Sequence, residues 1–262
     1  MNIRFNRAKR FFAWRKAFLI YCTSWLLLSI TSAAFASDDL EVEYPTVHAG
    51  EAEVSLLGMA YSDDDPDENH AQTWRVGAGY GVTDIWSSEL YAEYEKPADS
   101  SSISVQFYQW ENLIRLTKPG QYWADWAVNF EYAYATNEGD KDAYEIMPVM
   151  QKRFSQHMLT VNVSLERNPT ENDTTKLQLN YAWQYLWLGN PAIQFALEGY
   201  GKLGNATDWA PRAEQSHQLG PVLLGNLHTG PDNILSYRLG YYFGLTDAAT
   251  DRTLVLNLEY EL

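Results

Sequence analysis

The 262-residue sequence contains one cysteine, Cys22, and it is poor in basic residues. With a single thiol, the chain can form neither an internal disulfide nor a zinc–thiolate site. Only 19 Lys and Arg stand against 34 Asp and Glu, which gives a formal net charge of −15 at pH 7. Nucleic-acid phosphates require a basic surface, so we expect no nucleic-acid partner. No run of 18 or more apolar residues follows residue 36, which excludes a transmembrane helix beyond that point.

The first 36 residues have the pattern of a secretory signal peptide. Six basic residues precede any acidic one, an apolar stretch follows from Ala17, and the segment ends in Ala34-Phe35-Ala36. This order of basic, apolar and small residues predicts cleavage after Ala36, with a retained membrane anchor as the alternative. The remaining 226 residues carry 13 basic and 34 acidic side chains, a net charge of −21, and no cysteine.

Apolar and polar residues alternate with a period of two along the rest of the chain. In 254–262 the even-numbered positions are Leu or Tyr, and the odd-numbered ones are Val, Asn, Glu and Glu. This period puts successive side chains on opposite faces of a β-strand, whereas a helix would scatter them. Twelve strands are expected, at 51–62, 72–80, 86–95, 102–116, 122–134, 143–154, 159–165, 177–187, 191–202, 215–226, 235–245 and 254–262.

Short turns and longer polar loops alternate between these segments. An even strand number brings both ends of the sheet to the short-turn side, which is the asymmetry of outer-membrane barrels. Trp or Tyr stands near the ends of many apolar faces, as the rings that line a membrane interface do. We therefore predict an all-β fold, an antiparallel transmembrane outer-membrane β-barrel of about 12 strands in residues 50–262. A short periplasmic segment, 37–49, would precede it. A soluble β-sandwich is the alternative.

The last strand resembles the C-terminal signal that the outer-membrane assembly machinery reads, because an alternating apolar run ends in Tyr-x-aliphatic. This chain ends in Leu262, where that signal often has Phe. We expect the assembly machinery, membrane lipid and lipopolysaccharide as partners, in the outer membrane of a Gram-negative bacterium.

Several short motifs together are similar to a largely uncharacterised proteobacterial outer-membrane β-barrel family. They are GEAE at 50–53, YGVTDIW at 80–86, YAEYE at 91–95, WEN at 110–112, KPGQYW at 118–123, FEY at 130–132, QSH at 215–217, FGLT at 243–246 and LEYEL at 258–262. The sequence is also loosely similar to phenol meta-pathway transporter-like proteins. The resemblance implies a barrel in the outer membrane and suggests transport, and it carries over no catalytic residue.

If the apolar faces contact lipid, the polar faces line the lumen. The expected pore-lining residues are Glu89, Glu93, Asp125, Asn129, Glu131, Glu166, Lys176, Gln178, Glu198, Arg238 and Glu259. On 102–116 the same reasoning directs Gln106, Tyr108, Trp110 and Asn112 inward. An acidic lining favours cations and neutral solutes over anions. We expect a narrow porin or channel for small cationic, neutral polar or aromatic solutes, with a non-conducting structural or adhesive barrel as the alternative.

An outer-membrane lipid hydrolase is the remaining class. It would need Ser, His and an orienting Asn or Asp in one place. His217 with Ser216 is the nearest candidate, but adjacent residues of a strand point to opposite faces. We expect no catalytic residue, cofactor or metal. The acidic run Asp63–Glu68 lacks the glycine of a calcium loop and is expected to be solvated.

Overall fold

The computed structural model describes residues 40–138, 140, 142–167, 177–231 and 233–262, all within one compact unit. The predicted signal peptide, residues 1–36, lies outside the described residues, and so does Lys176. Across the described residues, no helix has both the length and the apolar character that crossing a membrane requires.

Twelve long strands make up the fold, as the alternation predicts. They are β1 (Ala52–Ser62), β2 (Gln72–Thr83), β3 (Trp86–Lys96), β4 (Ser104–Arg115), β5 (Asp125–Ala135), β6 (Ala143–Phe154), β7 (His157–Arg167), β8 (Gln178–Asn190), β9 (Ile193–Asn205), β11 (Ser216–His228), β12 (Ile234–Gly244) and β13 (Arg252–Glu261). The sequence did not predict the two-residue strand β10 (Asp208–Trp209) or the 3-10 turn η1 (Arg212–Glu214), both in the connection from β9 to β11.

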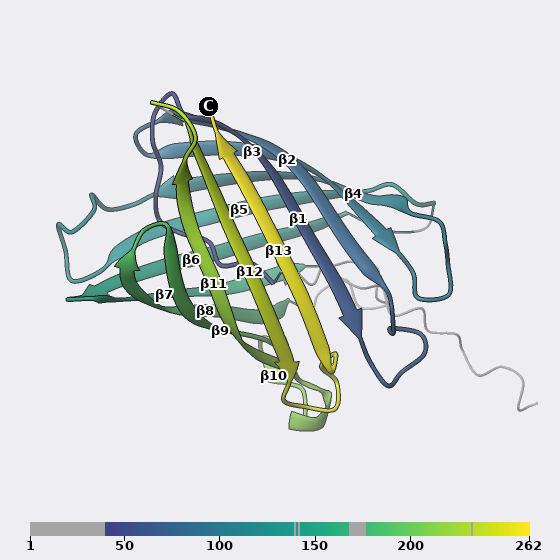
Figure 1. The fold of residues 1–262 in the computed structure, drawn as a ribbon. Coiled ribbons are helices and arrows are strands. Elements are labelled where there is room, and N and C mark those ends of the chain that lie inside the picture. Colours follow the sequence, from purple (N-terminus) through teal and green to yellow (C-terminus); the bar gives the residue numbers. More distant parts are fainter. Residues whose placement is uncertain (1–39, 139, 141, 168–176, 232) are drawn as a thin grey trace, which may run out of the picture. The chain divides into compact units, whose positions relative to one another are not determined.

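The strands form one closed antiparallel barrel (Figure 1). Each long strand pairs with the next along the chain, and β1 closes the circle by pairing with β13 from Glu53↔Glu261 to Ser62↔Arg252. Closure leaves no long strand with an unpaired edge. This is the condition under which a sheet can lie in hydrocarbon without exposing its backbone polar groups.

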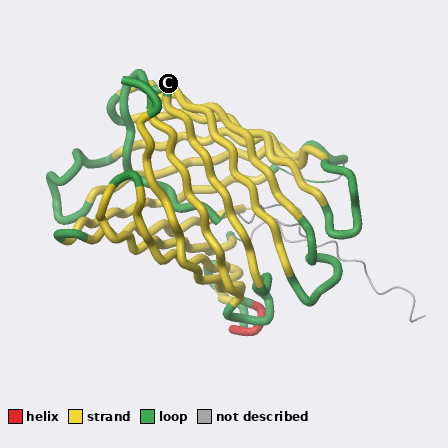
Figure 2. Tube along the Cα trace, viewed as in Figure 1, coloured by secondary structure: helices red, strands yellow, loops and turns green. Residues whose placement is uncertain are grey.

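The two ends of the barrel differ in their connections (Figure 2). At one end, which we call the short-turn end, two residues join β2 to β3, β6 to β7 and β8 to β9. Both β1 and β13 meet this end, where Leu262 N–H donates to the Ala52 carbonyl at 2.8 Å. At the opposite end, the loop end, the connections are longer and some contact one another. Asp251 N–H donates to Asp63 Oδ2 there at 2.9 Å. The predicted asymmetry is present.

The outer surface of the barrel is apolar. Each of the twelve long strands bears at least one exposed large apolar side chain, with Leu90 and Phe195 each 63% exposed and Trp187 59% exposed. A soluble domain rarely leaves so wide an apolar belt uncovered, whereas a membrane barrel requires one. The apolar content of the sequence therefore faces outward rather than filling a core.

The facing of β4 differs from the prediction. Tyr108 and Trp110 are about half exposed on the outer surface, while Gln109 and Glu111 are buried inside. The register between β3 and β4 shifts at Glu93/Tyr94, so the two strands do not keep one phase along their length. Apolar and polar residues are mixed on both faces of β4, and the aromatic rings of Tyr108 and Trp110 face outward because they can contact lipid there.

The inside of the barrel has two kinds of wall. The wall formed by β1, β9 and β11–β13 is partly apolar, with Leu57, Met59, Val222, Tyr242 and Val255 in one buried cluster. The wall formed by β3–β8 is rich in carboxylates and amides. This division decides where an apolar segment can lie inside the barrel and which side stays polar.

Candidate solute pathway inside the barrel

Residues 40–48, which we call the plug segment, lie inside the barrel. The sequence predicted a periplasmic location for 37–49, and the described part of that segment instead packs within the lumen. Leu40 and Val42 join the apolar cluster of β1, β9 and β11–β13, and Val47 packs on Leu113 and Val149 at the opposite wall. The physical reason is burial of apolar side chains, which water would otherwise surround.

The chain turns into the lumen at the short-turn end, where two glycines permit the turn. Gly50 has a φ of +86°, a backbone conformation that disfavours other residues. Its N–H donates to the Gly81 carbonyl on β2 at 2.7 Å. A side chain at Gly81 would collide with the carbonyl oxygen of His48. The C-terminal end of the plug segment therefore lies against the end of β2, and the preceding residues lie deeper in the lumen.

Hydrogen bonds hold the middle of the plug segment to β7 and β8. The Glu43 N–H donates to Asn162 Oδ1 at 2.8 Å, and Asn162 Nδ2 donates back to the Glu43 carbonyl at 3.0 Å. Gln184 Nε2 donates to the Tyr44 hydroxyl at 2.7 Å. Asn162 and Gln184 are at most 1% exposed. Two buried amides of the wall thus satisfy the backbone and a side chain of the segment.

A buried ionic cluster holds its first described residue. Arg238 Nη2 donates to the Leu40 carbonyl at 2.7 Å, and Nη1 donates to Glu198 Oε2 at 2.9 Å. The hydroxyls of Tyr200 and Tyr242 donate to the same Glu198 oxygen at 2.6 and 2.5 Å. Glu198 is fully buried, so its charge depends on these partners. Arg238 therefore binds both Glu198 of the barrel wall and the Leu40 carbonyl of the plug segment.

Glu41, a charged residue of the plug segment, contacts two further strands, β2 and β13. It forms a salt bridge with Arg75 on β2, whose guanidinium also faces Glu111 of β4 at 3.5 Å. Asn257 of β13 donates to Glu41 Oε1 at 2.8 Å. Together with the bonds to Asn162 of β7 and Gln184 of β8, these contacts bind the segment to opposite sides of the barrel, so it crosses the lumen between them.

Two cavities lie inside the barrel, one on each side of the plug segment. The inner cavity opens towards the short-turn end, measures about 910 Å³ and is lined by Glu53, Glu89 and Glu259 among others. The outer cavity lies towards the loop end and measures about 130 Å³. Its lining includes six carboxylates and two cations, in the order Glu41, Glu43, Glu111, Glu131, Glu145, Glu166, Arg75 and Lys202.

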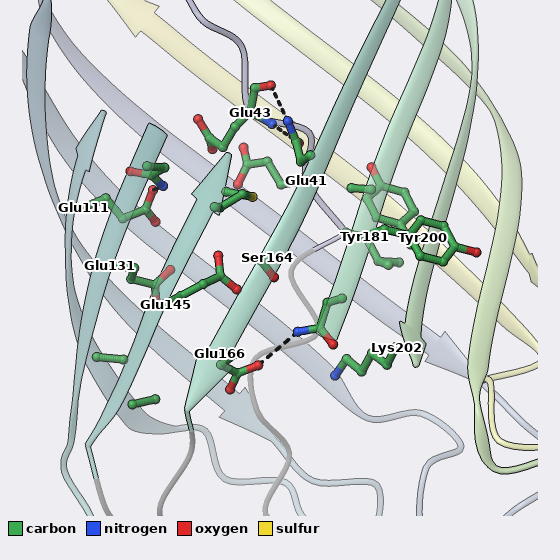
Figure 3. Close-up of a pocket in the computed structure, with 18 of the residues that line it drawn as sticks. Glu41, Glu43, Glu111, Glu131, Glu145, Ser164, Glu166, Tyr181, Tyr200 and Lys202 are labelled. Atoms are coloured by element: carbon green, nitrogen blue, oxygen red, sulfur yellow. Dashed lines mark hydrogen bonds between the residues drawn. The ribbon is translucent and has the colours of Figure 1, made fainter. Parts of the chain in front are cut away.

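Figure 3 shows how the outer cavity is arranged. The side chains of Glu111, Glu131 and Glu145 lie on one side, and those of Tyr200 and Lys202 lie on the other. Glu41 and Glu43 reach the cavity from the plug segment, so both cavities border the same stretch of chain.

The structure places most of the expected pore-lining residues at the inner face. Glu89 and Glu259 border the inner cavity, and Asn129, Glu131 and Glu166 border the outer one. Arg238 also borders the inner cavity, and Glu93 and Glu198 are buried inside the barrel. Gln178 pairs with Glu166 at the loop end of β8, and Asp125, the first residue of β5, accepts the Gly120 N–H at 2.7 Å.

The sequence did not indicate that Glu41, Glu43, Glu111 and Glu145 line the cavities. Apolar residues at positions 40, 42 and 47 are the signal in the sequence that the plug segment can be buried.

The pKa of Glu43 is raised well above its ordinary value. Removal of its carboxyl from water is the largest cause, and the nearby carboxylates of Glu111, Glu41 and Glu89 add to it. The Arg75 guanidinium opposes the effect. The carboxyl of Glu43 therefore holds its proton more strongly beside the acidic wall than it would in water.

His217 lies on the outer face of β11. Its Nδ1 meets the Tyr181 hydroxyl at 2.8 Å, and its Nε2 meets Gln215 Oε1 at 2.9 Å. Ser216 borders the outer cavity on the inner face instead, so the two residues do not form a catalytic pair. Within the described residues, no group of three or more His, Cys, Asp or Glu side chains could hold a metal ion.

Comparisons with known proteins support the fold. No family model and no curated protein matches the chain. Among solved structures, the chain is similar to the NanC porin, with a TM-score of 0.53 and 10% identity over 80% of this chain and 98% of that one. It is equally similar to an outer-membrane channel from Pseudomonas putida F1, with a TM-score of 0.53 and 11% identity over 84% and 99% of the two chains. The fold is thus that of porin-like outer-membrane β-barrels.

Proposed function

We propose that this protein is an outer-membrane channel of a Gram-negative bacterium that passes small cationic and neutral solutes and is closed by its plug segment. The observation that carries the proposal is the pair of acidic cavities on either side of residues 40–48. A barrel built only as a scaffold has no need of two carboxylate-lined spaces that meet at one crossing segment. The porin-like fold supports transport as the general role.

The charge of the lining supports a preference for cations. Carboxylates outnumber cations around the outer cavity, and Glu53, Glu89, Glu259 and Glu261 border the inner one. Rings of acidic side chains attract cations and repel anions at close range. The twelve-strand circumference is narrow, and the plug segment reduces the free cross-section further, so the solutes are small.

The Asn162 contacts and the Arg238 cluster are of a kind that can reform after release. They are hydrogen bonds and one ion pair rather than covalent links. The same contacts favour a second candidate, a permanently closed structural barrel, if the segment never leaves. Electrical recording separates the two functions because only a displaceable segment gives openings.

The test is recording from the purified, refolded mature protein in a planar bilayer under a gradient of potassium chloride. We expect discrete current steps and a reversal potential of the sign that potassium preference gives. Glu89→Gln combined with Glu259→Gln should shift that potential towards zero, whereas Glu214→Gln in η1 outside the lumen should not. No current at any voltage, in this protein and in a variant with weakened plug contacts, would contradict the channel and leave the structural barrel.

A further inference from the structure

Four glutamates of the outer cavity form a continuous row across neighbouring strands, which we call the glutamate ladder. Glu111 of β4 pairs with Glu131 of β5, Glu131 with Glu145 of β6, and Glu145 with Glu166 of β7. All four border the outer cavity. Glu89 of β3 extends the same row by pairing with Glu111, and it borders the inner cavity.

Such a row opposes the stability of the sheet. Like charges directly opposite one another in an antiparallel pair are destabilising, and here the arrangement repeats from strand to strand. Random placement of glutamates at the inner face would not align them in register over four strands. Carboxylates aligned in this way attract a positively charged ligand that enters the cavity.

Two buried amides point independently to the same chemistry. Gln109 and Asn129 are each 2% exposed, and both border the outer cavity. Within the part of the chain that the structure describes, the carbonyl oxygens Gln109 Oε1 and Asn129 Oδ1 have no hydrogen-bond partner. A buried acceptor without a donor costs free energy, so each such oxygen calls for an explanation.

The orientation of these amides is fixed by their neighbours. Asn129 Nδ2 donates to Glu111 Oε2 at 3.1 Å, and Gln109 Nε2 donates to Glu93 Oε2 at 3.5 Å. Carboxylates accept hydrogen bonds and cannot donate them when ionised, so the nitrogen of each amide must face its glutamate. The oxygen is left to accept from a donor elsewhere. The cavity thus presents carboxylates and amide oxygens together, a set made for a ligand rich in N–H groups.

We infer that the outer cavity binds a linear aliphatic polyamine along the glutamate ladder. This inference deepens the proposed channel function and rests on it for the route by which the solute arrives. Neighbouring strands are about 4.8 Å apart, so successive carboxylates recur at about that spacing along the row. Ammonium groups joined by short methylene linkers recur at a similar interval. Each can meet one carboxylate while the methylenes lie against the wall.

Other ligand classes fit less well. An anion would face six carboxylates against Arg75 and Lys202. A bare divalent ion needs several oxygens converging on one point, and no described group of acidic or histidine side chains is so arranged. A row of separated carboxylates instead matches a row of separated charges. The ladder therefore selects ligands by the spacing of their charges as well as by the sign of those charges.

The test is isothermal titration calorimetry of the full mature protein in detergent, with spermidine as the probe. We expect saturable binding that weakens as salt is raised, because exposed charges are screened. Glu131→Gln and Glu145→Gln should each weaken binding by about tenfold, the loss of one charge-assisted contact. Gln109→Met should weaken it by a smaller factor, since at nearly constant volume it removes one acceptor oxygen of the cavity, together with the Nε2 donor to Glu93. Glu214→Gln, outside the barrel lumen, serves as the charge-matched control.

The outcomes separate this inference from the channel itself. Absence of spermidine binding, equal binding of magnesium ion, or equal loss in the Glu214→Gln control would overturn the polyamine site, whatever the bilayer recordings show. Binding that the ladder variants abolish would support the site even in a barrel that passes no current. Circular dichroism and the heat-dependent gel mobility of each variant verify that the barrel is folded, so a loss of binding is assigned to the site.

Discussion

Replacement of Asn162 by alanine should release the plug segment. Asn162 is buried on β7 and makes two hydrogen bonds to one residue of the segment, one to the N–H and one to the carbonyl of Glu43. Alanine removes both bonds and changes neither the net charge of the lumen nor the strand pairing of β7.

The size of the effect follows from those two bonds. A hydrogen bond contributes about 0.5–1.5 kcal/mol net, so their loss weakens docking of the segment by about 1–3 kcal/mol. That free energy corresponds to about a 5- to 150-fold shift between the docked and displaced states. A segment that is displaced only rarely would then be displaced often enough to dominate the recorded current.

Single-channel recording measures this shift as the open probability. Asn180→Ala is the matched control, because Asn180 faces the same interior but donates to Glu166 of the wall, at 3.2 Å, rather than to the segment. We expect the open probability to rise in Asn162→Ala and to stay unchanged in Asn180→Ala. Equal open probabilities in the two variants would refute the claim that the segment at Glu43 closes the pathway.

Three further predictions concern the barrel and the plug segment. Arg238→Met should lower the free energy of unfolding in urea by about 3–5 kcal/mol, because the fully buried Glu198 loses its cation. Adding Glu198→Gln should restore most of this free energy, and no recovery in the double variant would contradict the pairing. The raised pKa of Glu43 makes docking of the plug segment strongest at low pH, where the carboxyl is protonated whether the segment is docked or displaced. Docking weakens as the pH rises above the ordinary pKa of a glutamate, because the displaced segment then releases the proton more readily than the docked one. The open probability should therefore rise with pH, and Glu43→Gln should flatten this pH profile. Leu239→Arg at the outward-facing middle of β12 should cost about 2–4 kcal/mol of unfolding free energy in lipid, and a cost near zero would argue against lipid contact there.

The strands were predictable because each one has a period-two pattern strong enough to set its facing. Strand β13 is the clearest case, with Leu254 and Leu256 outward and Asn257 inward. The membrane reinforces this pattern, since a one-residue slip would turn an entire polar face into lipid. Twelve strands and the alternation of turns and loops follow from the same signal.

The facing of β4 was not predictable from local alternation. Aromatic, amide and acidic residues alternate there without one clearly apolar face, and the register shift between β3 and β4 decides the phase. Glu111 was therefore missed, and with it the continuity of the glutamate ladder. Pairing partners in neighbouring strands fix such a row, and a single sequence does not contain them.

The plug segment was not predictable for a different reason. Its contacts join residues far apart in the chain, such as Leu40 with Arg238 and Glu43 with Asn162. Leu40, Val42 and Val47 indicate burial, but only the closed barrel shows that the buried space is the lumen itself.

A reversible disulfide between the plug segment and the wall tests the central claim most directly. Glu43→Cys with Asn162→Cys introduces one thiol on the plug segment and one on β7, at two positions that the Glu43 N–H and the Asn162 Oδ1 now join at 2.8 Å. Since Cys22 lies in the predicted signal peptide, the mature chain would contain no other thiol. We predict that the oxidised protein passes no current in a planar bilayer and that reductant restores openings, while Glu43→Cys alone does not respond to reductant. Equal currents before and after reduction, with the disulfide verified by mass spectrometry, would contradict a channel closed by its plug segment.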